Sequence, residues 1–545
     1  MRHGGKQRGL SRRELLKTLG LGAAAVGTGA AGLRDLMRPA RVAAAGAGPD
    51  TLVVGQDLSV QTLDPQIVYD NTLRITRGIY EGLVTLRGAT SQIIPRLATS
   101  WQSSPDAKVW TFKLRSGVKF HDGTPFGSDA VKATIERLLK INRGMGYAYK
   151  GVVSTIETPD PMTVRFNLTE PDAAFAAKLA AVSGAMMVSP AALTGHASGT
   201  DLAQGWLADH EAGTGPYMLE SYDKGAGEVV LAQFPGYWGG WQGQHVKRII
   251  FKITPEVSTQ RLMLEQGDAD VLTIVAPDII DALAKEPGIK VQSFPTMRIF
   301  YIAMQCQREP LKDVKIRQAL SYAFDYEAAR TLIFNGNLQP LYGPLPNADP
   351  AHLSASDKPY HLDMAKAKQL LGESSHPNGG FTLSLFLFQG DPTFRKAAEI
   401  LQNQLKQLNI TVDIQELASS VVLDKAGKLD TAPDLLPVRN YPDYADSSAM
   451  LDGTFGKDAW GSAGWNFSYY ANDKAEQLMK QANEMTNQRQ RIQLFKDAQK
   501  IMVSEAPAIF IGTLVYRVAM RSNVQGYVYN PALGNTFDLY AISKS

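Results

Sequence analysis

The feature that most constrains the fold is the alternation of strand-like and helix-like segments along the chain after residue 50. The segment VWTFKLRSGVKF (109–120) alternates apolar and polar residues, with Trp110 and Phe112 on one face, as a half-buried strand does. The segment SDAVKATIERLLKI (128–141) carries apolar residues at helical spacing, and its leading Ser and Asp predict a helix cap. Such segments follow one another without a fixed-period repeat. The pattern predicts an α/β fold.

The chain has 545 residues, too many for one simple hydrophobic core, so two or three subdomains are expected. The pattern begins afresh near Met297, and a later helix over 362–373 is predicted to start at Asp363 as its N-cap. The strand-rich tail beyond about residue 513 is too short to stand alone. We therefore expect two α/β lobes, with the tail returning to the first lobe.

Charge is distributed unevenly between the N-terminal segment and the rest of the chain. Nine cationic and two acidic residues precede Ala45, so this segment carries +7. Subtracting it from the total of +3 leaves −4 for the remainder. A mildly acidic body has no electrostatic attraction for nucleic acid, so a nucleic-acid partner is not expected. No stretch of the body approaches the roughly 18 uninterrupted apolar residues that a membrane span requires.

The N-terminal segment itself has the layout of a cleavable export signal. A basic start is followed by a weakly apolar Gly/Ala-rich middle and a small-residue end. SRRELLK resembles the twin-arginine signal, with the pair at Arg12 and Arg13. We expect residues 1–45 to be a signal peptide cleaved after Ala45 or Ala47. The alternative, an amphipathic helix of the mature protein, is disfavoured because its glycines would weaken a helix.

Cysteine usage sets further limits. Cys306 is the single cysteine, so no disulfide can form within the chain and no cysteine follows the signal to accept a lipid. The sequence therefore predicts a soluble periplasmic protein, exported through a twin-arginine-type signal and not a lipoprotein. Cys306 lies in the apolar run FYIAMQCQ and is interpreted as a small core residue.

Signatures of catalysis are scarce. The sequence contains no Walker loop, no nucleophile elbow and no histidine pair at metal-site spacing. His121 and Asp122 are adjacent in KFHDGTPF, but a turn between a strand and a helix explains them better than a catalytic pair does. We therefore predict no catalytic residue, no metal site and no cofactor.

Aromatic residues gather between Asn440 and Tyr470, together with acidic and small residues. Aromatic walls with a few polar groups suit a cleft that binds a small molecule. We interpret Tyr441, Asp443, Trp460 and Trp465 as candidate ligand contacts. The alternative is that this segment serves packing alone.

Several spaced segments resemble the solute-binding proteins of ABC importers in the dipeptide/oligopeptide/nickel group, family 5. The longest is PRLATSWQSSPDAKVWTFKLRSGVKFHDGTPFGSDAVKATIERLL (95–139). GTGPYMLESY, VKRIIFKI, GDADV, VKIRQALSYAFD and YPDYAD follow in the order of the family. The resemblance covers about residues 51–540.

This resemblance implies a periplasmic-binding-protein type II fold, in which two lobes close by a hinge around the ligand. Lobe 1 would comprise 51–88, 213–297 and 513–545, with an extra subdomain inserted at 89–212. Lobe 2 would comprise 298–512. The closed form would dock on an ABC permease at the inner membrane, no reaction is implied, and a monomer is expected.

The resemblance also suggests ligand contacts. In peptide-binding members an acidic residue ahead of the Tyr-Pro-Asp stretch pairs with the ligand ammonium, but Asn440 stands at that position here. Arg395 matches an arginine that can bind the peptide carboxylate, or it is a solvated residue at a helix start. Asn440 points to a sugar-like solute or a modified peptide without a free amine, and Asp443 remains a possible partner for a cation.

Three functions are compatible with these features. The favoured one is a periplasmic receptor that delivers a small organic solute, peptide-like, sugar-like or a modified peptide, to an ABC importer. The alternatives are a chaperone or ligand sensor on the same fold, and an exported hydrolase. Turnover of a bound solute would distinguish the hydrolase, whereas binding of unfolded proteins or docking to a sensor kinase would distinguish the other two.

Overall fold

The computed structural model describes residues 48–545 except 58, 69–70, 274–276, 358–359 and 535. The predicted signal segment 1–45, with Arg12, Arg13 and both proposed cleavage sites, lies outside the described residues. Within the described part of the chain, no helix is both long and apolar enough to cross a membrane.

Eleven of the described strands form one sheet in which strands distant in the sequence are neighbours. The path runs β15, β14, β16, β12, β17, β11, β1, β10, β9 and β8, and β13 pairs with β17 off this path. Their bounds are Ile410–Leu417, Phe381–Phe388, Leu435–Asn440, Ile289–Met304, Ala508–Arg521, Val271–Leu272, Thr51–Gln56, Arg248–Ile253, Glu228–Gln233, Tyr217–Asp223 and, for β13, Leu338–Pro340. The mixture of parallel and antiparallel pairs with helices confirms the predicted α/β class.

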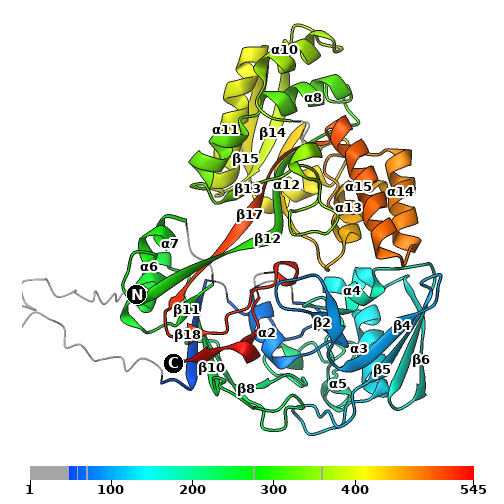
Figure 1. Ribbon diagram of the computed structural model, residues 1–545, viewed down its shortest axis with the longest axis vertical. Coiled ribbons are helices and arrows are strands. Elements are labelled where there is room, and N and C mark those ends of the chain that lie inside the picture. The colour runs from blue at the N-terminus through cyan, green and yellow to red at the C-terminus, as the bar shows by residue number, and fades with distance from the viewer. Residues whose placement is uncertain (1–47, 58, 69–70, 274–276, 358–359, 535) are drawn as a thin grey trace, which may run out of the picture. The chain divides into compact units, whose positions relative to one another are not determined.

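Two long strands, β12 and β17, run antiparallel through the middle of this sheet and connect its two ends (Figure 1). Ile289 pairs with Arg521 at one end of the ladder and Ala303 pairs with Ala508 at the other. The register shifts between Pro295 and Ile299, which marks a bulge in the ladder. Residue 297 lies inside β12 and residue 513 inside β17, so both predicted lobe boundaries fall within continuous strands. The exact lobe bounds stay a prediction.

The first lobe is built on β1, β8, β9, β10 and β11 with α2 (Leu73–Ile79), α6 (Val257–Gln266) and α7 (Pro277–Leu283). Its core joins residues as distant in sequence as Leu52, Phe251 and Val518, all fully buried. The tail after β17 contributes Phe537 and Leu539 to the same core. The C-terminal tail therefore packs with the first lobe.

A second sheet belongs to the region between β2 (Val84–Leu86) and β8. It has the order β4 (Ala98–Ser103), β5 (Val109–Leu114), β7 (Thr163–Leu168) and β6 (Val153–Asp160). Helix α3 (Ser128–Ile141) packs on β6 and β7. The strands β3 (Ile93–Pro95), β18 (Val524–Gln525) and β19 (Ser543–Lys544) and the helices α4 (Phe175–Leu179) and α5 (Pro190–His196) complete this half.

Helix α3 has the predicted length, but its predicted Ser/Asp cap is wrong. The N-cap residue is Gly127 and no side chain caps the helix. The hydroxyl of Ser128 instead donates to the carbonyl oxygen of Asp160 at 2.9 Å, because the strand β6 ends beside the helix. By contrast, Asp363 caps α10 as predicted, since its Oδ1 accepts from the backbone N–H of Lys366 at 2.9 Å.

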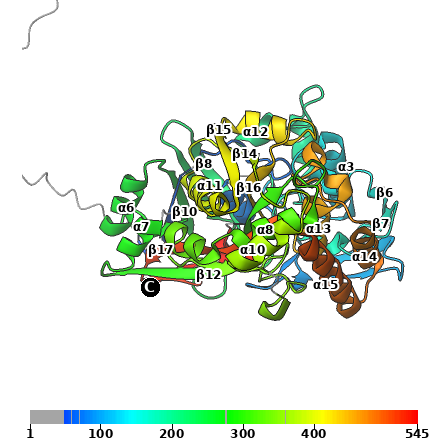
Figure 2. The same ribbon diagram turned by 90° about the horizontal axis from the view of Figure 1, so that it is seen from above.

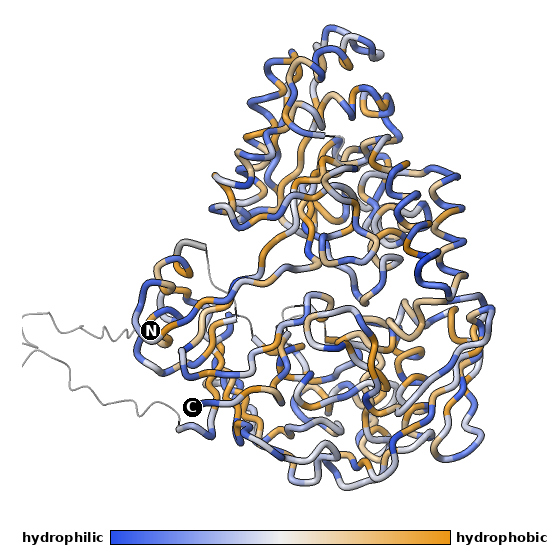
Figure 3. The backbone as a smooth tube through the Cα atoms, in the orientation of Figure 1, coloured by the Kyte–Doolittle hydropathy of each residue, from blue (hydrophilic) through white to orange (hydrophobic). Residues whose placement is uncertain are grey.

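The second lobe surrounds one large core that runs from Ile299 to Ile511. Its helices are α8 (Val314–Ala323), α9 (Tyr326–Ala328), α10 (Met364–Gly372), α11 (Pro392–Leu405), α12 (Ser419–Ala426), α13 (Ser447–Phe455), α14 (Asp473–Glu484) and α15 (Gln488–Glu505). Figure 3 shows apolar residues concentrated along the central strands and polar residues along the outer helices. Helices α14 and α15 pack on each other, at the opposite side of the molecule from α6 and α7 (Figure 2).

Candidate functional site

The bulge in the ladder of β12 and β17 is stabilised by Thr296. We call this place the crossing, because both strands pass here from one lobe to the other. The Thr296 hydroxyl donates to the carbonyl oxygen of Leu514 at 2.6 Å and accepts from the backbone N–H of Arg298 at 3.0 Å. These bonds replace the ladder bonds that are lost between Pro295 and Ile299. A bulge of this kind redirects side chains away from the regular alternation of a strand. Arg298 is therefore presented at the crossing.

A cavity of about 310 Å³ opens at this crossing. Residues from both sides of the crossing line it, namely Thr273, Ile280, Thr296, Arg298, Ile333, Phe334, Asn337, Thr393, Arg439, Leu514, Val515, Tyr516 and Arg517. Its volume lies at the small end of the range of roughly 300–1,000 Å³ that is usual for ligand pockets. The cavity therefore suits a small solute that would contact both lobes at once.

Three arginines line this cavity, and two of them already have anionic partners. Arg439 forms an ion pair with Asp391, and its guanidinium lies 4.6 Å from the centre of the Phe394 ring. Arg517 forms an ion pair with Asp281, with 2.6 Å between Nη1 and Oδ1. These two arginines are held in place by contacts within the protein.

Arg298 differs from the other two. Its guanidinium lies 5.1 Å from the centre of the Tyr441 ring, over the aromatic face. Among the described residues, no carboxylate forms an ion pair with it. Burial lowers the pKa of Arg439, and the positive charge of Arg298 lowers this pKa further. The cavity thus carries an excess of positive charge that an anionic ligand group would offset.

Three of the predicted contact residues, Asn440, Tyr441 and Asp443, follow Arg439 closely in the sequence but are not among the residues that line the cavity. Asn440 ends β16 directly after Arg439, and its Nδ2 donates to the Thr454 hydroxyl at 2.8 Å. Its Oδ1 accepts from the backbone N–H of Tyr441, so the amide is engaged within the protein. Tyr441 reaches the site through its contact with Arg298. Asp443 accepts a hydrogen bond from the hydroxyl of Tyr147, which comes from the region between β2 and β8.

The remaining predicted contacts, Arg395, Trp460 and Trp465, are also absent from the lining of the cavity. Arg395, on α11, is 44% exposed at its side chain and forms an ion pair with Glu416 of β15. The Nε1 of Trp460 donates to the carbonyl oxygen of Tyr470 at 2.7 Å. The 47% exposed Trp465 packs edge-on against Phe467, with ring centres 5.6 Å apart. A role in ligand contact for Arg395, Asn440, Tyr441, Asp443, Trp460 and Trp465 stays a prediction.

Sequence reasoning missed Arg298, Arg439 and Arg517. A signal was present for the first two, because each is a cation within an apolar strand, in TMRIFYIAM and LLPVRN. A charge within an otherwise buried strand requires a partner or a ligand. Arg517 lies in the similar run GTLVYRVAM.

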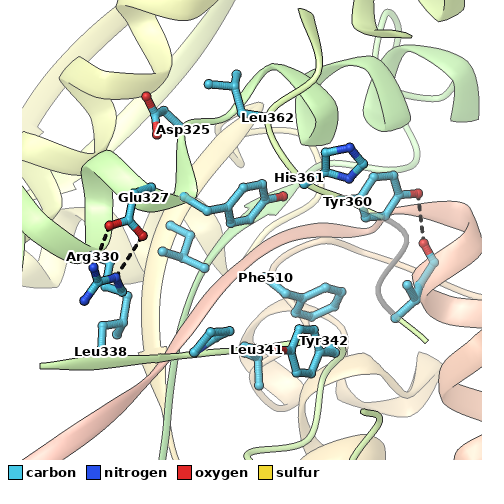
Figure 4. A pocket seen from close by; sticks show the side chains of 14 residues that line it. Asp325, Glu327, Arg330, Leu338, Leu341, Tyr342, Tyr360, His361, Leu362 and Phe510 are labelled. Carbon is cyan, nitrogen blue, oxygen red and sulfur yellow. Dashed lines mark hydrogen bonds and ion pairs between the residues drawn. The ribbon is translucent and has the colours of Figure 1, made fainter. Parts of the chain in front are cut away.

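A second cavity, of about 260 Å³, lies within the second lobe (Figure 4). Apolar and aromatic side chains, among them Leu341, Tyr342 and Phe510, form its wall. Two of its charged side chains, Glu327 and Arg330, form an ion pair with each other at 2.5 Å. All of its lining residues belong to the second lobe, so a ligand there would not join the two lobes.

Comparison with known proteins agrees with this architecture. The family profile described as "Bacterial extracellular solute-binding proteins, family 5 Middle" matches residues 92–462. The "Probable D,D-dipeptide-binding periplasmic protein DdpA" of Escherichia coli (strain K12) is 34% identical over 92% of this chain and 96% of that protein. The "Glutathione-binding protein GsiB" of Pectobacterium atrosepticum is 28% identical over 88% of this chain and 91% of that protein.

Solved structures show the same fold. HbpA2 from Haemophilus parasuis has a TM-score of 0.81 at 24% identity, over 91% of this chain and 100% of that chain. DppA from Helicobacter pylori in complex with the peptide STSA has a TM-score of 0.75 at 25% identity, over 91% of this chain and 98% of that chain. The predicted periplasmic-binding-protein type II fold with two lobes is confirmed.

Proposed function

The chain belongs to family 5 of the bacterial extracellular solute-binding proteins and serves an ABC importer, and from this premise we propose that its ligand is a dipeptide or a similarly small peptide-like solute. The proposal includes the place of binding, which is the cavity at the crossing of β12 and β17. Closure of the two lobes around the solute would then present the loaded protein to the permease.

One observation carries the proposal of the binding place. The cavity at the crossing is lined from both lobes and bordered by the two strands that connect them. A ligand that contacts both lobes favours the closed arrangement, because binding shifts the equilibrium toward the state that it contacts more extensively. The second cavity, within one lobe, offers no such coupling.

The class of ligand is supported by relatives and by cavity size. One relative is a probable D,D-dipeptide-binding protein, another binds glutathione, and a similar structure holds the peptide STSA. A cavity of about 310 Å³ lined by three arginines suits a short peptide with a free carboxylate better than a neutral sugar. The amide of Asn440 is engaged by Thr454, so the ligand amine would need a different partner.

The location and state of the protein are also proposed. The basic, Gly/Ala-rich N-terminal segment with Arg12 and Arg13 supports export to the periplasm through the twin-arginine route. The single cysteine at position 306 is not available as a lipid acceptor behind a signal, which supports a non-lipidated protein. We propose that the protein acts there as a monomer and catalyses no reaction.

Calorimetry with the purified protein tests the ligand class. The panel comprises D-Ala-D-Ala, L-Ala-L-Ala, glutathione and a neutral disaccharide. We expect at least one of the three peptides to bind with a Kd in the micromolar range or below and the disaccharide not to bind. Binding of the disaccharide alone would contradict the proposal. Analysis of the peptide after titration provides the control for hydrolysis, since a receptor releases it intact.

A further inference from the structure

The Arg298 guanidinium is the starting point, because its charge is only partly exposed and lacks an anionic partner among the described residues. An unpaired cation that is partly removed from water costs free energy of folding. Because Arg298 lines the cavity, an anionic group of a ligand could reduce this cost.

The position of this side chain is supported by two contacts, one at its backbone and one at its guanidinium. Its backbone N–H is bound to the hydroxyl of Thr296, which fixes the start of the side chain at the bulge. The face of the Tyr441 ring supports the guanidinium 5.1 Å away. Stacking on an aromatic face leaves the N–H groups at the edge of the guanidinium free to donate in its plane. A planar carboxylate is the group that matches this fork of donors.

The other two arginines of the cavity do not compete for this role, since Arg439 is paired with Asp391 and Arg517 with Asp281. The charges of these two arginines are already offset by their carboxylate partners. Arg395, the residue suggested by family resemblance, is paired with Glu416 at the surface and is not among the residues that line the cavity. A ligand carboxylate would have to displace Glu416 to reach it.

We propose that Arg298 anchors the carboxylate of the bound solute, and that Arg439, held by Asp391, supplies a second positive charge beside it. The protein therefore selects solutes with a free carboxylate, and Tyr441 positions the anchor. This inference rests on the proposed dipeptide function and specifies which end of the ligand is recognised.

The test pairs a protein variant with a ligand variant. The affinities of D-Ala-D-Ala and of its C-terminal amide are measured by calorimetry for the wild type and for Arg298→Gln. The wild type is expected to bind the free acid roughly 10–100-fold more tightly than the amide, the scale of one hydrogen bond to a charged group. In Arg298→Gln this preference should disappear, because the acid loses affinity by the same factor and the amide does not.

Two further variants separate the possible explanations. Arg395→Gln tests the position that the family resemblance suggests; if Arg298 is the anchor, this variant keeps the full preference for the acid. Arg298→Lys keeps the charge without the fork of donors, so its preference for the acid over the amide should be intermediate. This variant tests the inference if Arg298→Gln does not fold. Both variants are first compared with the wild type by thermal unfolding.

The outcomes distinguish this inference from the proposed function. If the wild type binds neither member of the pair, and no other peptide of the panel, the dipeptide function and this inference fail together. If the wild type prefers the acid and Arg298→Gln keeps that preference, the inference alone is overturned. Loss of the preference in Arg395→Gln instead would assign the carboxylate to the surface position.

Discussion

Asp349 provides a sharp test of how burial and hydrogen bonding determine the stability of the second lobe. Only 2% of this residue is exposed. Its Oδ1 accepts hydrogen bonds from the hydroxyl of Ser447 and from the backbone N–H of Ala351, both at 2.7 Å. Burial raises the pKa of the carboxyl from 3.8 to about 6, although both hydrogen bonds oppose the shift.

The sign and size of the effect follow from this shift. A carboxyl with a raised pKa in the folded state contributes most to stability below pH 4, and this contribution is lost as pH rises through about 6. The difference between 3.8 and about 6 corresponds to roughly 3 kcal/mol at most. Asp349→Asn keeps an oxygen for both hydrogen bonds and carries no charge. We expect it to be more stable than the wild type at pH 8 by up to this amount.

Urea unfolding at pH 4, 6 and 8 measures the effect, with the exposed Asp458→Asn as control. Asp458→Asn should change the free energy of unfolding by less than about 0.5 kcal/mol at each pH. Asp349→Asn should show a smaller loss of stability between pH 4 and pH 8 than the wild type. The reasoning would be refuted if the free energy of unfolding changed equally with pH in the two proteins, while its dependence on urea concentration was also the same in both.

Three further predictions concern other residues of the chain. Arg491→Gln should lower the free energy of unfolding by about 3–5 kcal/mol in urea titrations, because it leaves Asp446 buried without the cation that now lies 2.6 Å away. Gly526→Ala should lower the free energy of unfolding by about 2 kcal/mol or more in the same assay, because φ at this residue is +71° and the added Cβ would lie 1.9 Å from the carbonyl oxygen of Ala541. Unchanged stability of this variant would contradict the prediction. Cys306 should resist iodoacetamide at pH 8 until the protein is unfolded, because burial raises the pKa of its thiol to about 11. Mass spectrometry measures the labelling, and rapid labelling of the native protein would disprove the prediction.

Much of the fold could be predicted because its determinants are local in the sequence. The apolar spacing in 128–141 identified α3, and Asp363 identified the start of α10. Spaced family segments supplied the two-lobe arrangement. The cap of α3 was missed because the partner of Ser128 lies on β6, which becomes its neighbour only in the folded chain.

The candidate site was less predictable, because its decisive features are relations between distant residues. Arg395 reads as a free cation in the sequence, yet the parallel pairing of β14 and β15 brings Glu416 to it. Arg298 reads as one charge in an apolar strand, and its significance depends on the bulge opposite Leu514 and on the ring of Tyr441. The spacing of residues along the chain does not reveal such pairings.

The place of binding is the central claim, and a crystal structure of the protein with D-Ala-D-Ala, or with the solute that co-purifies under native conditions, tests it most directly. The account predicts ligand density at the crossing of β12 and β17, with a carboxylate within hydrogen-bond distance of the Arg298 guanidinium. Density in the apolar cavity of the second lobe, beside Tyr342 and Phe510, with the crossing left empty, would contradict it.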